Sequence, residues 1–413
     1  MEIGHCLQIR VVPPVNFRDI EAAAGRIKGA VVYTPCPLSI PLSEATGLQV
    51  YCKMENLQRT GSFKERGARN ALLTLSEEAQ RRGVIAASAG NHALGLSYHG
   101  QLLKIPVTVV MPQFAPLTKV TNCRRFGAEV ILHGNSFAEA RSRAGEIGAE
   151  KGLTYINGYD DVPIIAGQGT LGIEIIEQVP DVDAVIVPVG GGGLIAGIAT
   201  AIRKLKPGVM IIGVEPERCA SFTAAIKAGG PTAVEARATL ADGLAVTKVG
   251  KNAFETARPF VDKILLVNEQ QIALAILRLL ELEKSVVEGA GAAGLAACLA
   301  GMVPNLIGKK VVLPLCGGNI DSSTLGKILE RGLAHDGRLC RLTVTISDRP
   351  GGLARFASII GEEGGSVVEI DHDRAFASED ITTVVVHCVV ETRDHEHIGA
   401  IKARLTKEGF AHD

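Results

Sequence analysis

The sequence predicts an α/β protein with parallel sheets, followed by a small α+β unit near the C-terminus. Short apolar runs alternate with helical stretches from Gly83 onward, which is the pattern of βαβ units in a parallel sheet. Many of the 47 glycines stand just after apolar runs, as tight turns between strands and helices require. After Gly337 the runs alternate between apolar and polar residues, which is typical of half-buried strands.

The first helix is expected from Phe17 to about Lys28 with Asn16 as its N-cap, and the first strand covers residues 50–54. The βαβ alternation follows in two parts. Strands of the first part are expected at 84–87, 107–110 and 129–132, with helices from about His92, Leu117 and Ser136. Strands of the second part are expected at 184–189, 210–214, 263–267 and 311–315, with helices from Leu194 and over 272–282, 290–300 and 322–332.

The last part of the chain has the order βαββα of a ferredoxin-like unit. Its strands are expected at 341–347, 367–372 and 382–390, and its helices at 353–363 and 394–407. Residues 409–413 leave little room for a closing strand, so that strand is expected to be short or absent. We place the boundary in front of this unit near residues 333–338.

The composition is that of an ordinary globular protein. The 413 residues are enough for two or three domains, and the net charge of −1 gives no electrostatic reason to expect nucleic acid. The nine cysteines are scattered without a C-x-x-C pair, which predicts reduced thiols rather than disulfides or a zinc site. Residues 1–17 lack a signal-like apolar core, and no stretch approaches a membrane span. We therefore expect a cytoplasmic protein that binds neither nucleic acid nor membrane.

Residues 58–67 place a lysine where a helix begins. Ser62 and Glu65 have the S-x-x-E spacing of a capping box, so the helix is expected to start at Phe63. Lys64 then lies in the first turn, where the helix dipole opposes a positive charge. Such an amine loses its proton more easily, and a neutral lysine amine can condense with an aldehyde. A solvated surface lysine is the other interpretation.

A four-glycine loop, Gly190–Gly193, connects an apolar strand to a helix. Residues without side chains leave backbone N–H groups free to converge, and the helix N-terminus adds partial positive charge, so this loop is expected to bind a phosphate. Two alternatives remain open. One is a simple tight turn. The other is a dinucleotide site, in which Gly191, Gly193 and Ala196 form the fingerprint and Glu215 binds the ribose.

Two further loops follow predicted strands. The segment Ser88–His92 offers backbone amides suited to a carboxylate, together with the side-chain amide of Asn91. Cys316 opens the segment Cys-Gly-Gly-Asn, and a thiol there is neutral unless something lowers its pKa. Loops at the carboxyl ends of parallel strands open on the ligand-binding edge of a sheet, so we expect these loops to meet at one site.

Two acidic residues are candidates for the surroundings of this site. Glu288 is a lone acid in an apolar, glycine-rich run, where acids are seldom buried without a reason. It either lines the site or caps the following helix. Asp242 is a similar candidate, although a polar turn is its preferred interpretation.

Taken together, these motifs resemble those of the pyridoxal-phosphate enzymes of fold type II, and within them the threonine/serine dehydratases, or threonine ammonia-lyases. The tail, with Asp348-Arg349-Pro350-Gly351, resembles an ACT domain. The matching motifs occur in the family's order: Ser62-Phe63-Lys64, Ser88-Ala89-Gly90-Asn91-His92, Gly190 to Leu194, Val287-Glu288-Gly289-Ala290 and Cys316-Gly317-Gly318-Asn319. The resemblance implies two parallel-sheet α/β domains and a ferredoxin-like third one. They are a large cofactor-binding domain (1–55 and 155–332), a small domain (56–154) and an ACT-like regulatory domain (338–413).

The resemblance also implies a role for each motif. Pyridoxal 5'-phosphate would be held by Lys64 as a Schiff base, with Phe63 packed beside its ring. Asn91 would meet the ring hydroxyl and Cys316 the ring nitrogen. The phosphate would be bound by Gly190, Gly191, Gly192, Gly193 and Leu194, and the substrate carboxylate by Ser88, Ala89, Gly90, Asn91 and His92.

The implied reaction is β-elimination of water from threonine or serine. The freed Lys64 removes the Cα proton, the β-hydroxyl leaves with a proton from the cofactor phosphate, and the products are ammonia and 2-oxobutanoate or pyruvate. A neutral Cys316 leaves the ring nitrogen unprotonated, which suits elimination, whereas an acid at this position would favour transamination.

Serine racemases share nearly all of these motifs. They have a serine, as proton donor opposite the lysine, at the position of Ala89, so the alanine favours a dehydratase. The divalent-metal site found in such enzymes would use Glu215, but Ser221 stands where a second acid is expected. Two alternatives from other classes are a dinucleotide-dependent oxidoreductase and a non-catalytic amino-acid sensor.

The ACT-like tail implies regulation by an amino acid bound near residues 348–353, at a site formed with a second chain. The expected assembly is a homodimer or homotetramer. Feedback inhibition by isoleucine, in isoleucine biosynthesis, is our hypothesis for the effector. The other interpretation is a dimerisation module without a ligand.

Overall fold

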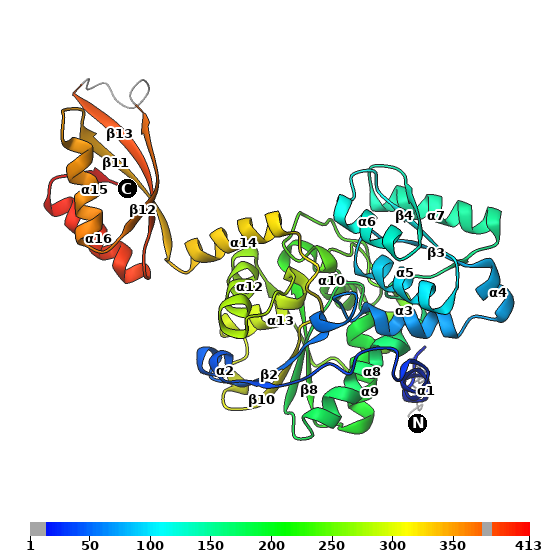
Figure 1. Cartoon of the computed structure of the whole chain (residues 1–413). Helices are drawn as coiled ribbons and strands as arrows, with labels where there is room; N and C mark the ends of the chain where they lie inside the picture. The colour runs from blue at the N-terminus through cyan, green and yellow to red at the C-terminus, as the bar shows by residue number, and fades with distance from the viewer. Residues whose placement is uncertain (1–13, 374–381) are drawn as a thin grey trace, which may run out of the picture. The chain divides into compact units, whose positions relative to one another are not determined.

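The computed structural model describes residues 14–373 and 382–413. The chain divides into two compact units, Met1–Asp321 and Ser322–Asp413. The first unit contains two parallel sheets surrounded by helices, and the second contains one antiparallel sheet (Figure 1). This architecture confirms the predicted fold class.

The larger sheet of the first unit has six strands in the order β1-β2-β10-β7-β8-β9, and only β1 and β2 are antiparallel neighbours. Val185 and Val187 of β7 pack in the core cluster with α8 (Val162–Gln178) and α9 (Gly193–Leu205), whereas Ile186 faces α13 (Gly289–Leu299). Helices therefore cover both faces of this sheet, because successive strand residues point to opposite faces. The strands are β1 (Leu38–Ser39), β2 (Gln49–Lys53), β7 (Ala184–Pro188), β8 (Met210–Pro216), β9 (Lys263–Val267) and β10 (Lys310–Pro314).

The smaller sheet has four parallel strands in the order β5-β4-β3-β6. Its two faces are covered by separate core clusters, one with α3, α5 and α6 and the other with α7. The strands are β3 (Val84–Ala87), β4 (Val107–Met111), β5 (Glu129–Leu132) and β6 (Thr154–Tyr155). The helices are α3 (Lys64–Leu73), α4 (Glu77–Arg82), α5 (Asn91–Leu103), α6 (Leu117–Arg125) and α7 (Phe137–Lys151).

Helix α8 is absent from the sequence prediction, although it is the helix most closely packed against α9. A Cβ on Gly169 of α8 would lie 3.0 Å from the carbonyl oxygen of Gly197 in α9, and one on Gly197 would lie 2.5 Å from the backbone nitrogen of Gly169. These glycines let the two helices touch. A helix buried on most sides carries no amphipathic period, so the sequence pattern does not reveal it. The other elements are α1 (Phe17–Ile27), α2 (Ile40–Thr46), α10 (Ser221–Ala228), α11 (Lys251–Ala257) and α12 (Glu269–Glu283).

The predicted capping box in front of α3 is wrong. Helix α3 begins at Lys64, and Phe63 stands at its N-cap with helical angles and no side-chain hydrogen bond. The Glu65 carboxylate accepts instead from the backbone N–H of Thr60, and the Ser62 hydroxyl has no partner. Ser62 pairs through its backbone with Gly317, and this tertiary contact replaces the local cap. By contrast, Asn16 caps α1 as predicted.

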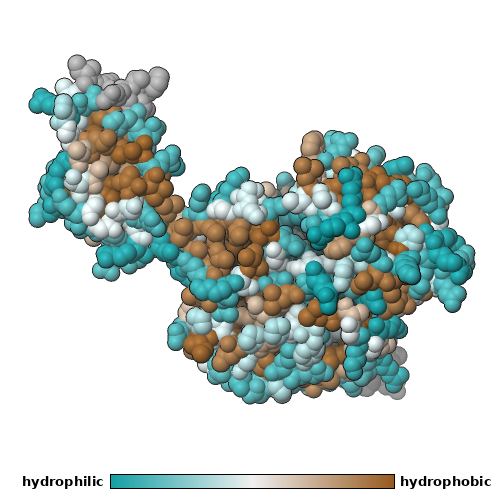
Figure 2. All heavy atoms as spheres, viewed as in Figure 1, coloured by the Kyte–Doolittle hydropathy of each residue, from teal (hydrophilic) through white to brown (hydrophobic). Residues whose placement is uncertain are grey.

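From β11 onward the second unit has the predicted order of strands and helices, and its closing strand, β14, is short; α14 precedes them in the same unit. The sheet order is β12-β13-β11-β14, so β12 lies at an edge. Val367, Val368 and Ile370 on β12 are exposed, and Figure 2 shows apolar atoms gathered on the visible face of this unit. The elements are α14 (Ser322–His335), β11 (Leu339–Ser347), α15 (Gly352–Glu362), β12 (Ser366–Asp373), β13 (Thr383–Glu391), α16 (His395–Lys407) and β14 (Ala411–His412).

Residues 14–373 and 382–413 bear on the predictions about membrane spans and cysteines. None of their helices is both long and apolar enough to cross a membrane. Their eight cysteines are free thiols, as predicted, and Cys6 lies outside the described residues.

Candidate active site

One cavity of about 630 Å³ in the first unit collects most of the predicted site residues. Three of the loops that line it follow the carboxyl ends of β3, β7 and β10. They come from two sheets, whereas the sequence suggested the edge of one. Ala89 and Glu215 do not line this cavity. The predicted residues that do are Phe63, Lys64, Ser88, Gly90, Asn91, His92, Gly190, Gly191, Gly192, Gly193, Leu194, Asp242, Glu288 and Cys316.

Lys64 reaches into this cavity from the first turn of α3. Its Nζ donates a hydrogen bond of 2.6 Å to the carbonyl oxygen of Gly158. Burial lowers the pKa of Lys64 to about 8, and the nearby Cys316 and Glu288 offset only part of this effect. About half of an amine with this pKa is neutral at pH 8, and the neutral form attacks aldehydes. The alternative of a solvated surface lysine is therefore wrong.

The four-glycine loop meets the cavity at the start of α9, where the first-turn amides lack intrahelical partners and the helix dipole is positive. Gly192 has a φ of +89°, which favours glycine. A Cβ on Gly191 would lie 2.3 Å from the ring of Tyr159, and one on Gly193 would lie 2.2 Å from the Tyr159 carbonyl oxygen. A simple tight turn would not need glycine at all three positions.

Glu215 is fully buried at the end of β8 and serves a structural purpose. Its carboxylate accepts hydrogen bonds from the backbone N–H groups of Phe222 and Thr223, at 2.6 and 2.9 Å, and from the Thr223 hydroxyl at 2.7 Å. It thereby holds the start of α10. The dinucleotide alternative thus loses its ribose-binding acid. In the part of the chain that the structure describes, no group of three or more His, Cys, Asp or Glu residues could hold a metal ion.

Asn91 is part of a hydrogen-bond chain in the cavity wall. Its Nδ2 donates to Glu288 Oε1 at 2.7 Å, and its Oδ1 accepts from Nδ2 of Asn319 at 2.8 Å. Asn319 in turn donates to the carbonyl oxygen of Thr60 at 2.7 Å. These contacts determine which way the Asn91 amide faces and leave it one N–H for a ligand.

Glu288 lines the cavity and is buried. It stands at the N-cap of α13, but its side chain makes no capping hydrogen bond, so the first of its two interpretations holds. Burial raises the pKa of Glu288 to about 7, and the negative charge of Asp242 adds to the shift. Asp242 is more exposed, and its carboxylate lies 3.4 Å from Nζ of Lys119.

The loop after β3 offers fewer free amides than its sequence suggests. The N–H of Ser88 donates to the carbonyl oxygen of Val110, and the N–H of Gly90 donates to the Ser88 hydroxyl. Ala89 packs against the apolar core beside the small sheet. The amides at the start of α5, from Asn91 and His92, remain for a carboxylate.

The imidazole of His92 is neutral. Burial lowers the pKa of His92 to about 3, and the charge of Lys64 contributes to the shift. Its Nε2 lies 3.1 Å from the carbonyl oxygen of Ile156, so we assign the ring proton to Nε2 as the donor. His92 therefore positions its loop rather than carrying charge into the site.

Cys316 lines the cavity as a neutral thiol. Its Sγ donates to the carbonyl oxygen of Pro314 at 3.2 Å. Burial raises the pKa of the Cys316 thiol well above its ordinary value. A neutral sulfur suits an unprotonated ring nitrogen better than an ionised acid would.

The sequence pattern does not predict several residues that line the cavity, chiefly Gly158 and Tyr159 in the turn before α8. The Asn157 side chain accepts from the backbone N–H of Tyr159 and Asp160, at 3.0 and 3.1 Å, and so shapes this turn. The Asn-Gly dipeptide signals a turn, but no sequence signal shows that it meets Lys64. Arg141 of α7 also lines the cavity, and no local pattern points to it.

These groups fit pyridoxal phosphate. The amine of Lys64 can react with its aldehyde, and the glycine loop, which has no room for side chains, can bind its phosphate. The neutral thiol of Cys316 suits its ring nitrogen. A family model described as pyridoxal-phosphate dependent enzyme matches residues 27–317. The chain belongs to this family, and its cofactor is pyridoxal 5'-phosphate.

Individual relatives narrow the comparison. The chain is 44% identical to an L-threonine ammonia-lyase of Thermotoga maritima over 396 residues, which cover 96% of this chain and 98% of the relative. It is 45% identical to an L-threonine ammonia-lyase of Geobacter sulfurreducens, over 95% of this chain and 98% of that one. Among solved structures, the processed threonine deaminase isoform 2 of Solanum lycopersicum has a TM-score of 0.73 at 37% identity, covering 78% of this chain and 98% of that chain. Maize serine racemase has the same TM-score at 32% identity, with the same two coverages.

The lowered pKa of Lys64 predicts how the cofactor-free protein captures pyridoxal phosphate. As pH rises through about 8, Lys64 loses its proton, so the rate of covalent capture should increase and then level off. An ordinary lysine would keep gaining rate up to about pH 10.4. Stopped-flow absorbance across this pH range measures the midpoint. A midpoint at the ordinary lysine value would contradict the expected effect of burial.

Proposed function

We propose that the protein is an L-threonine ammonia-lyase that eliminates water from threonine, and also from serine, to give ammonia and 2-oxobutanoate or pyruvate. The observation that carries the proposal is that Lys64, the four-glycine loop and Cys316 meet in one cavity. The near full-length similarity to L-threonine ammonia-lyases supports this choice of reaction.

Pyridoxal phosphate, when bound, withdraws electrons from the substrate Cα and so makes the loss of its proton possible. The neutral amine of Lys64 accepts that proton at Nζ. The amides at the start of α5 would hold the substrate carboxylate, and the remaining N–H of Asn91 would be available to the ring hydroxyl. The amides of Gly190–Gly193 and Leu194 would hold the phosphate, and Phe63, which also lines the cavity, would pack beside the ring.

Serine racemase is the alternative within the same fold. Racemisation needs a proton donor on the face opposite Lys64. The resemblance gives that role to the position of Ala89, which does not line the cavity here and has no group to donate. The serine racemase of maize is also less similar in sequence than the L-threonine ammonia-lyases, at 32% against 44% identity. Both observations favour elimination.

The direct test is an assay of the purified, cofactor-loaded protein. We expect a yellow protein that releases 2-oxobutanoate from L-threonine and pyruvate from L-serine, with borohydride fixing the cofactor to Lys64. Chiral analysis of the remaining serine should find little D-serine. Fast appearance of D-serine would replace the proposal by racemisation. A colourless protein that binds a nicotinamide dinucleotide, or only amino acids, would exclude a lyase altogether.

The arrangement of domains and chains is also proposed. The strands of the six-stranded sheet lie at 38–53 and 184–314, which supports a large cofactor-binding domain, with proposed bounds of 1–55 and 155–332, around a small domain of 56–154. The residues of α14 within these bounds, 322–332, belong to the second compact unit of the structure. The antiparallel sheet supports an ACT-like domain of residues 338–413. The exposed apolar side chains on the edge strand β12 favour pairing in a homodimer or homotetramer.

Regulation and location complete the proposal. An amino-acid effector, with isoleucine as our candidate, would bind near residues 348–353 with a second chain. Added branched-chain amino acids should then change the kinetics of the threonine assay, and unchanged kinetics would remove the effector. The free thiols favour a reducing compartment, so we assign the protein to the cytoplasm.

A further inference from the structure

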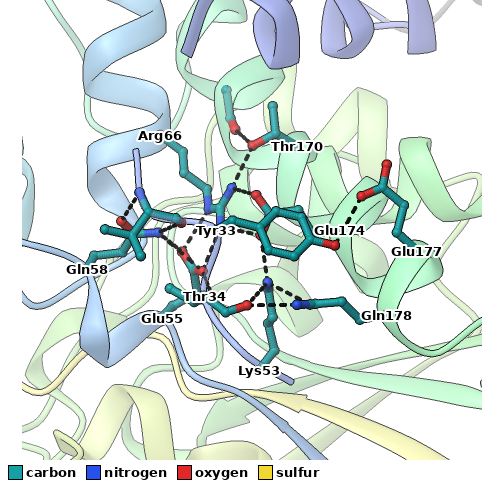
Figure 3. Close-up of polar contacts among 12 residues, drawn as sticks. Tyr33, Thr34, Lys53, Glu55, Gln58, Arg66, Thr170, Glu174, Glu177 and Gln178 are labelled. Carbon is teal, nitrogen blue, oxygen red and sulfur yellow. Dashed lines mark hydrogen bonds and ion pairs between the residues drawn. The ribbon is translucent and has the colours of Figure 1, made fainter. Parts of the chain in front are cut away.

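Beside the segment that carries Lys64, four charged side chains are buried together: Lys53, Glu55, Arg66 and Glu174 (Figure 3). We call them the buried charge cluster. The side chains of Lys53, Glu55 and Arg66 are completely shielded from solvent, and that of Glu174 is 14% exposed. Their two positive and two negative charges balance. None of the four lines the cavity, so the proposed reaction does not use them directly.

The Arg66 guanidinium lies at the centre of this cluster (Figure 3). Its Nε and Nη2 donate to the two oxygens of Glu55 at 2.8 and 2.7 Å. Its Nη1 and Nη2 donate to the two oxygens of Glu174 at 2.5 and 2.9 Å, and Nη1 also donates to the Thr170 hydroxyl at 3.2 Å. All five N–H groups of the arginine are therefore used, and two carboxylates determine the direction of its fork.

The Lys53 ammonium is equally well satisfied. It donates to the Thr34 carbonyl oxygen at 2.6 Å, to Glu174 at 2.6 Å and to the Gln178 side chain at 2.8 Å. The Thr34 hydroxyl donates to Glu55 at 2.6 Å. Burial raises the pKa of Glu55, but the charge and hydrogen bonds of Arg66 outweigh burial and hold the pKa below its ordinary value. The cluster is thus a complete ionic network.

The cluster holds both ends of the segment that carries Lys64. Glu55 lies at its start, and Arg66 lies two residues beyond the lysine. Between them, the N–H of Phe63 donates to the carbonyl oxygen of Cys316 at 3.0 Å. Further backbone bonds tie the same two segments, from Asn56 N–H to the Leu315 carbonyl at 2.8 Å and from Gly318 N–H to the Gly61 carbonyl at 2.9 Å. These hydrogen bonds hold the backbone segments of Lys64 and Cys316 together, and the Glu55–Arg66 ion pair joins the two ends of the Lys64 segment.

Folding stability alone does not explain why these buried residues are charged. Removing charges from water is costly, and apolar residues of similar volume often stabilise a core equally well. What two bidentate contacts add is a defined direction and distance. At this place in the fold, that geometry concerns the position of Lys64 relative to Cys316.

We propose that the buried charge cluster positions Lys64 for proton transfer, with Arg66 and Glu55 holding the segment that sets the lysine against Cys316. This inference rests on the proposed lyase function and assigns Arg66 as a positioning residue. A misplacement of about 1 Å at the reacting group can cost about 100-fold in rate, so a small loosening should be measurable.

The test replaces the arginine by a lysine, Arg66→Lys, which keeps the charge but loses the planar five-donor fork. We expect kcat for threonine to fall by about 10- to 100-fold with KM nearly unchanged. In the cofactor-free protein, hydrogen exchange at the amides of Phe63 and Gly318 should become faster. Thr34→Val is the milder second variant, because it removes only the hydroxyl bond to Glu55, and it should change both readouts in the same direction.

The matched control is Ile202→Ala, a truncation of a buried core residue of α9 that removes no hydrogen bond or charge of the cluster and lowers the stability of the fold. It should keep kcat and the local exchange rates. Wild-type kcat and exchange in Arg66→Lys and Thr34→Val would overturn the proposal, as would an equal loss of kcat in the control at matched stability. If Arg66→Lys does not fold, the Thr34→Val result decides. A wild-type protein inactive on threonine would refute the lyase function instead, and the exchange readout would still test the positioning.

Discussion

Replacing Lys64 with alanine is expected to abolish threonine turnover, by about 10⁴-fold or more, while the protein remains folded. The substitution removes both the covalent attachment of the cofactor and the base that accepts the Cα proton. Both roles need the amine that lies on the Gly158 carbonyl inside the cavity, and alanine removes it. Release of 2-oxobutanoate and the circular dichroism of the purified variant measure the two outcomes.

A second lysine of the same cavity provides the control. Lys248 lines the cavity but is exposed, so Lys248→Ala should keep most of the turnover. Retained activity in Lys64→Ala would overturn the whole assignment. An equal loss in both variants would show that the cavity needs positive charge in general rather than one nucleophilic amine.

The Gly193→Ala variant should bind the cofactor more weakly. A Cβ at this position would lie 2.2 Å from the backbone oxygen of Tyr159, which is too close for any relaxation of a side chain to relieve. The start of α9 must therefore move away and take the phosphate-binding amides with it. We expect a loss of about 1–3 kcal/mol in folding stability and a rise of at least about tenfold in the Kd for pyridoxal phosphate.

Gly145→Ala is the matched control for this prediction. Gly145 lies in α7, and a Cβ there would meet no atom within 4 Å. Alanine is the better helix former, so this variant should be neutral or more stable by up to about 1 kcal/mol, with an unchanged Kd. Urea unfolding and fluorescence titration with pyridoxal phosphate measure both quantities. Normal cofactor affinity in Gly193→Ala would place the phosphate elsewhere.

The candidate site could be predicted in large part because its residues stand in local patterns. Gly190–Gly193, Asn91 and Cys316 each follow a short apolar strand, and parallel strands expose such loops at their carboxyl ends. Gly158 and Tyr159 follow a two-residue strand with little pattern of its own, so their place beside Lys64 was not predictable. Helix α8 was missed for a related reason, since burial on most sides removes the periodicity that identifies a helix.

The sequence by itself determined most strands of the two parallel sheets and the helices that follow them, which loops carry glycine, and which residue types can hold a phosphate, an aldehyde and a ring nitrogen. These properties depend on neighbours along the chain. Only the tertiary structure decided how each polar group is used. In the structure, Glu215 accepts hydrogen bonds from the start of α10, and the Ser88 amide donates to the neighbouring strand. The Glu65 carboxylate accepts from the Thr60 amide. The tertiary structure also brought Arg66 together with Glu174, because buried charges must find partners wherever packing places them, over a hundred residues away in this case.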